Sequence, residues 1–124
     1  MDFSKVTRLR KVKIWLGNLD DVPIAMALKT ITSDHRDLQK ISLLIRVSSL
    51  PNEPVGEETR RLWAEFDNIL IRLWESKTIK IYAQVVCPMC VDHEAVWKLV
   101  RSLLTGTLER GAIELICRLY QYYH

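Results

Sequence analysis

Short apolar runs alternate with helix-type patterns along the whole chain. The runs are rich in β-branched residues and centre on residues 12–14, 41–45, 79–82 and 113–116. Between the second and third runs, residues 62–74 carry large apolar side chains at the i, i+3, i+4 and i+7 spacing of an amphipathic helix. This order predicts a parallel α/β sheet of about four strands, with one helix in each connection.

The first connection contains signals for the start of a helix. Asp20 or Asp21 can cap it, and Pro23 stands near the first helical position, where its missing N–H is tolerated. The helical spacing then predicts one buried face, made of Ile24, Ala27, Leu28 and Ile31.

The later connections follow the same logic. Residues 48–56 hold two prolines and a glycine and are expected to form a loop before the strong helix. Asp92 can cap the last helix, whose apolar positions extend through Leu104. Gly106 or Gly111 is expected to end that helix.

Two predicted strands share a sequence pattern, which favours a repeat. The pattern Leu-x-x-Val/Ile-x-Ile/Leu begins at Leu9 and again at Leu38, as in the strand portion of a leucine-rich repeat. We therefore predict an α/β fold class, a short irregular leucine-rich-repeat-like β/α stack, with a small open doubly wound sheet as the alternative. Residues 1–124 are expected to form a single β/α repeat-like domain, either complete in itself or a fragment of a longer repeat protein.

Composition predicts a globular domain, and the net charge does not indicate a nucleic-acid partner. A hydrophobic content of 48% and a charged content of 27% are ordinary for a globular domain and argue against intrinsic disorder. The net charge of +3 gives no reason to expect a nucleic-acid partner. The densest basic cluster, at residues 8–13, alternates with apolar positions and is interpreted as the solvated face of a strand.

The sequence shows no export or membrane signal, which predicts an intracellular protein. No apolar run approaches the roughly 20 residues that a membrane span needs, so no membrane association is expected. The first residues lack the apolar core of a secretory signal. We expect a cytoplasmic or nuclear location, where the three cysteines would be thiols.

One motif could carry chemistry. Cys87-Pro88-Met89-Cys90 stands between a predicted strand and a predicted helix, as in thioredoxin-like oxidoreductases, where a helix N-terminus lowers a thiol pKa. The same cysteines with His93 and Cys117 could instead form a tetrahedral zinc site. The third interpretation is that these are small buried apolar thiols with no reactive role.

Other chemistry is not indicated. His35 and His124 have no acid or nucleophile nearby in sequence, and there is no phosphate-binding glycine loop, G-x-S-x-G or H-E-x-x-H. No catalytic residues, cofactor-binding residues or cofactors are therefore predicted, and the chain is expected not to be an enzyme.

Three longer phrases support a resemblance. They are residues 37–43, the Trp63-x-x-Phe66-Asp67-x-x-Leu70 pattern with Trp74-Glu75-Ser76, and residues 108–115. Over most of its length the chain resembles the carboxy-terminal, irregular leucine-rich-repeat region of uncharacterised fungal F-box-type proteins. The F-box itself is absent from this sequence. The resemblance implies a surface that holds a protein partner and offers no catalytic residues.

The expected function is therefore a non-enzymatic protein-interaction module of unknown partner. The alternative is a thiol-redox or zinc-binding protein that uses the Cys87-to-Cys90 motif. We also expect self-association, because the terminal strands of a short stack are exposed unless caps cover them.

Overall fold

The computed structural model describes residue 3 and residues 8–32, 35–47, 56–76, 79–88 and 92–120, with the backbone alone for residues 115–120. The strands are β1 (Lys11–Leu16), β2 (Lys40–Arg46), β3 (Lys80–Pro88) and β4 (Ile113–Tyr120). The helices are α1 (Val22–Ala25), α2 (Glu57–Ser76), α3 (His93–Leu103) and α4 (Thr105–Glu109), and the 3-10 turns η1 (Leu19–Asp21) and η2 (Met26–Thr30) flank α1.

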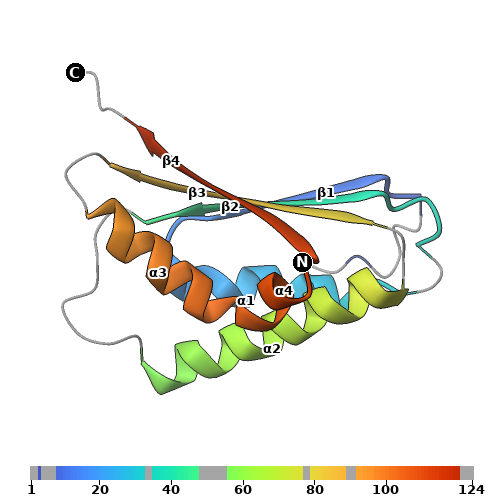
Figure 1. Cartoon of the computed structure of the whole chain (residues 1–124). Coiled ribbons are helices and arrows are strands. Elements are labelled where there is room, and N and C mark those ends of the chain that lie inside the picture. The colour runs from blue at the N-terminus through green and yellow to red at the C-terminus, as the bar shows by residue number, and fades with distance from the viewer. Residues whose placement is uncertain are drawn as a thin grey trace.

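The four strands form one parallel sheet in the order β1-β2-β3-β4. This confirms the predicted α/β class and the parallel pairing. The described helices all lie on one face of the sheet (Figure 1). The doubly wound alternative is wrong, because that fold places helices on both faces and reverses its strand order at a switch point. A small single-wound β/α stack is what the chain forms.

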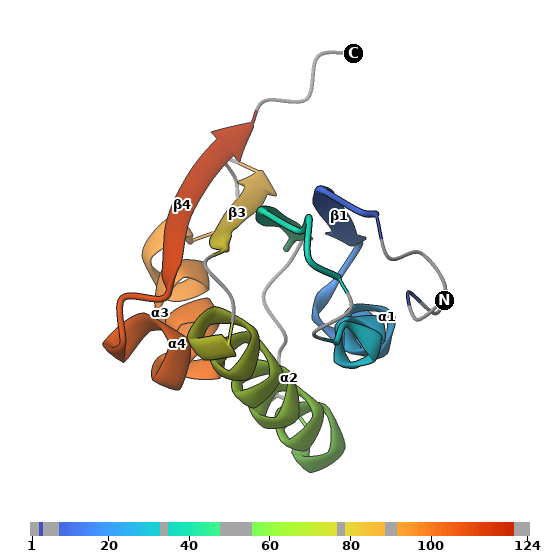
Figure 2. The same cartoon turned by 90° about the vertical axis from the view of Figure 1, so that its right-hand side faces the viewer.

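The core lies between the sheet and its helices. Inward side chains of the strands, such as Ile14, Leu43 and Val85, alternate with more exposed ones and are fully or almost fully buried. Seen end-on, α1 lies under β1, α3 and α4 lie under the β4 side, and α2 closes the layer between them (Figure 2). The predicted stripe of α2 is confirmed at Trp63, which is fully buried, but not at its last residue, Trp74, which is 36% exposed.

The first helical segment differs from its prediction. It is broken into η1, α1 and η2 instead of forming one helix. The cap is Asn18, which accepts a hydrogen bond from the Asp20 N–H (2.8 Å) and donates its own N–H to the Asp21 carboxylate (3.1 Å). Ile24 is 49% exposed, so its place on the buried face was wrong. The prediction assumed about 3.6 residues per turn throughout. A 3-10 turn has about three residues per turn, so the residues on either side of it no longer share one face.

The last helical segment is also interrupted. Asp92 caps α3 as predicted, accepting a hydrogen bond from the Ala95 N–H (3.2 Å). The helix stops after Leu103, and a second helix, α4, starts at once. Gly106 lies inside α4 and does not end the helix, whereas Gly111 follows it with a φ of 67° that suits glycine.

Several expectations concern residues outside the described ranges. These are the loop at 48–55, Cys90 and the last four residues of the chain. Among the helices that the structure describes, none combines the length and apolar character of a membrane span. β1 and β4 are the edge strands of the sheet, and self-association through them stays a prediction that light scattering can test.

Candidate functional site

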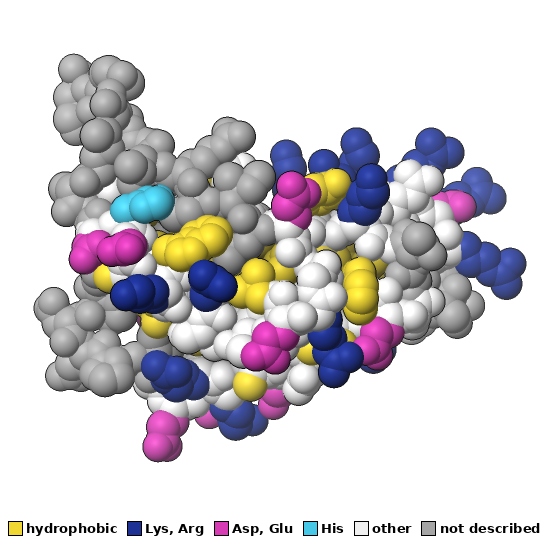
Figure 3. Space-filling view, viewed as in Figure 1, with side chains coloured by type: hydrophobic (Ala, Val, Ile, Leu, Met, Phe, Trp, Pro, Cys, Tyr) yellow, Lys and Arg dark blue, Asp and Glu magenta, His cyan; other side chains and the backbone are white. Residues whose placement is uncertain are grey.

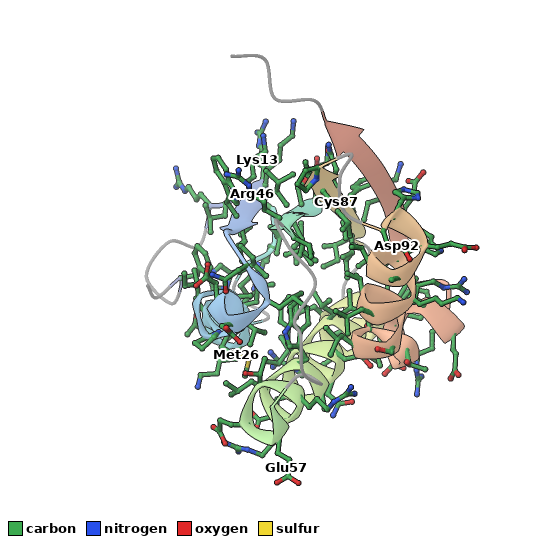
Figure 4. The ribbon with its side chains drawn as sticks, turned by 90° about the vertical axis from the view of Figure 1, so that its left-hand side faces the viewer. Lys13, Met26, Arg46, Glu57, Cys87 and Asp92 are labelled. Atoms are coloured by element: carbon green, nitrogen blue, oxygen red, sulfur yellow. The ribbon has the colours of Figure 1, made fainter. Side chains whose placement is uncertain are left out.

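The face of the sheet opposite the helices carries the most distinctive side chains. No helix of the described ranges covers this face (Figure 1). Lys13 of β1 and Arg46 of β2 both extend from the sheet on the side away from the helices (Figure 4). Because side chains alternate along a strand, the less buried residues of β1, β2 and β3 share this side. We call this surface the open face.

Three lysines form a row across the open face. The strand register aligns Lys11 with Lys40 and Lys40 with Lys80. Adjacent strands are about 4.8 Å apart, so like charges lie side by side. Like charges placed directly opposite one another destabilise a sheet. Lys and Arg side chains gather at the upper right of the molecule, where the strands begin (Figure 3).

Two arginines of the helical layer have acidic partners, and the lysine row does not. Arg110 pairs with Glu75 at 2.7 Å, and Arg61 pairs with Glu58 at 2.6 Å. The hydrogen bond that Arg61 donates to Glu58, aided by the negative charge of that carboxylate, raises the pKa of Arg61 above its usual value. Within the described ranges, no ion pair involves the three lysines of the row. Their positive charge is therefore available to a partner.

An aromatic and apolar patch lies farther along the same face. Trp15 of β1 is 64% exposed, and its register partner on β2 is Leu44, which is half-buried. The next residue across the sheet from Leu44 is Gln84. An exposed tryptophan beside an aliphatic residue, with charged residues near it, is typical of a protein-binding site.

The predicted cysteine site is brought together only in part. Cys87 is a free thiol whose side chain is fully buried, and His93 is exposed in the first turn of α3. Cys117 pairs in register with Val85, two positions before Cys87, and the side chain of Cys117 lies outside the described ones. Among the described residues there is no group of three His, Cys, Asp or Glu side chains placed to hold a metal ion.

Burial of Cys87 gives a direct prediction. In a Cys90→Ser, Cys117→Ser variant, the remaining thiol is expected to react with Ellman's reagent at least about 100-fold more slowly in buffer than in urea, because reaction requires local opening. Absorbance at the released thiolate measures the rate. Equal rates in buffer and urea would support the reactive-thiol interpretation.

His35 is buried and has a structural role. Its Nδ1 accepts a hydrogen bond from the Thr32 N–H at 3.0 Å, and its Nε2 lies 2.7 Å from the Phe3 carbonyl oxygen, to which it donates. Both ring nitrogens are therefore engaged in holding the chain near Phe3, so His35 is not placed to act as a general base.

The lysine row was not anticipated from the sequence. The basic cluster at residues 8–13 was interpreted as a solvated strand face, and Lys11 and Lys13 are indeed exposed on β1. A signal was present: a lysine stands directly before the first inward apolar residue in three strands, as Lys11-Val12, Lys40-Ile41 and Lys80-Ile81. Only the register shows that the three lysines form one row.

No family model, no curated protein and no solved structure matches this chain.

Proposed function

We propose that this chain is a non-enzymatic protein-interaction module that binds its partner on the open face of the sheet. The observation that carries the proposal is Trp15, a large aromatic side chain that is 64% exposed within a regular strand. Removing such a side chain from water on binding is strongly favourable, and tryptophan is enriched among the residues that dominate interface energies.

The rest of the open face supports this role. Leu44 extends the apolar contact. Lys13 precedes Trp15 on β1 and Arg46 follows Leu44 on β2, and both charged residues lie on the same side of the sheet (Figure 4). This arrangement of an apolar centre within a polar rim is the usual anatomy of a protein interface. A partner-holding surface is also what the resemblance to the repeat region of fungal F-box-type proteins implies.

The thiol-redox and zinc alternatives have less support. A reactive thiol needs solvent access, and Cys87 is fully buried. We also infer a cytoplasmic or nuclear location, in keeping with Cys87 as a free thiol.

Site-specific photo-crosslinking tests the proposed face. A photoreactive amino acid replaces Trp15 in one variant and Ile24 in a matched control, because Ile24 is also apolar and exposed but lies on α1. We expect a discrete adduct from position 15 in the cells that make the protein, and its partner is identified by peptide mass spectrometry. The purified partner should then bind the unmodified chain. Equal adducts from both positions, or a captured protein that does not rebind, would contradict the proposal.

A further inference from the structure

We propose that the segment bound on the open face is acidic, and that its carboxylates pair with the row formed by Lys11, Lys40 and Lys80. This inference rests on the proposed function, and it adds the chemistry of the partner. It is carried by the register of β1, β2 and β3, which places three lysines from distant parts of the sequence side by side.

The charge of the open face is strongly one-sided. Lys13 lies one row beyond the lysine row, and Arg46 lies farther along on the same side. Glu114 is the acidic residue on this side among the described side chains of the four strands. Neighbouring lysines repel one another in the free protein, and a run of carboxylates between them would relieve that repulsion.

The spacing on the open face defines the ligand further. Trp15 follows Lys11 by four positions on β1. At about 3.3 Å per residue, the apolar patch lies roughly 13 Å from the lysine row. An extended partner segment would therefore carry acidic residues at one end and a large apolar residue about four positions away.

Single-stranded nucleic acid fits this face less well. Such ligands need several free aromatic rings on which bases stack. The Lys40 Nζ lies 4.8 Å from the centre of the Tyr82 ring, so that ring already has a cation against it. Trp15 is left as the exposed aromatic ring of β1.

Fluorescence anisotropy with defined probes tests the inference. The first probe is a dye-labelled peptide with a run of Glu at one end and Leu residues at the other. The second has Gln in place of Glu, and the third is single-stranded oligo-deoxythymidine. We expect the Glu peptide to bind at least about tenfold more tightly than the Gln peptide, and this advantage to shrink as salt is raised.

Variants locate the effect on the lysine row. Replacing Lys11, Lys40 and Lys80 by Gln should reduce the affinity for the Glu peptide to that for the Gln peptide. The matched control removes the same charge from the helices, by replacing the exposed residues Lys29, Arg60 and Lys98 with Gln, and should change the affinity by less than about twofold. The single variant Lys40→Gln should also weaken binding while its thermal midpoint stays within a few degrees of the parent, which separates binding from folding.

The outcomes separate this inference from the proposed function. Equal binding of the Glu and Gln peptides, with both weakened by Trp15→Thr, would overturn the acidic partner and leave the protein-binding face in place. Binding that does not depend on Trp15 or on the lysines, or no binding, would overturn both. Tighter binding of the oligonucleotide, lost on lysine replacement, would overturn the inference in favour of a nucleic-acid ligand.

Discussion

Replacing Asp67 with alanine is expected to lower the free energy of unfolding by roughly 2–4 kcal/mol. The Asp67 carboxylate on α2 accepts hydrogen bonds from the backbone N–H groups of Gly106 and Thr107, both at 2.9 Å, and from the Thr107 hydroxyl. Thr107 is fully buried. Alanine would leave these donors at the start of α4 without their acceptor, and buried donors without partners are costly.

Urea denaturation measures this loss, with two comparisons. Asp67→Asn keeps one side-chain oxygen as an acceptor and should lose about half as much stability. Asn68→Ala changes the exposed neighbour on the same helix and should shift the stability by less than about 0.5 kcal/mol. If Asp67→Ala were no more destabilising than Asn68→Ala, the contact between α2 and α4 would not hold the two helices as described.

Replacing Trp63 with alanine is expected to be the most damaging single change, at about 3–5 kcal/mol. Trp63 is fully buried in the first half of α2, and its ring stands edge-on to Phe66 with 5.7 Å between the ring centres. Its Nε1–H also donates a hydrogen bond to the Leu19 carbonyl at 3.0 Å, which ties α2 to η1. Alanine would open a large cavity and leave that carbonyl without its donor.

Two further variants, measured in the same urea experiment, show what causes the loss of stability. Trp63→Phe keeps most of the apolar volume but loses the bond to Leu19, so an intermediate loss is expected. Trp15→Ala removes the same side chain from the open face and should cost less than about 1.5 kcal/mol, because Trp15 is largely in water. Similar losses for Trp15→Ala and Trp63→Ala would contradict the assignment of one side chain to the core and the other to the surface.

Much of the fold could be predicted from apolar periodicity. The stripe on α2 follows a helical period because large side chains such as Trp63 and Phe66 must face one core. The parallel strands were predictable because long connections with helical patterns separate them. The break between α3 and α4 was not, because it depends on a tertiary contact. Asp67 is distant in sequence from Gly106, yet it binds the start of α4.

The one-sided arrangement of the helices was the main feature that periodicity left open. The alternation on β1, with Lys11 and Lys13 between buried residues, indicated a solvated face for that strand. The runs in β2 and β3 place Leu44 and Val86 on the open face, where apolar residues hide the alternation. The lysine row depends on strand register, which no single strand encodes by itself. The cysteine motif was visible in the sequence, but the burial of Cys87 was not.

Isothermal titration calorimetry with purified proteins can measure how tightly the partner captured at position 15 binds to the open face. Trp15→Thr replaces the ring with a β-branched residue that also suits a strand, and Ile24→Thr makes a comparable change on α1. We predict that Trp15→Thr weakens binding by about 30-fold or more, as expected for an interface hot spot, and that Ile24→Thr changes it by less than about twofold. Unchanged affinity for Trp15→Thr, or an equal loss for Ile24→Thr, would contradict a binding surface on the open face of the sheet.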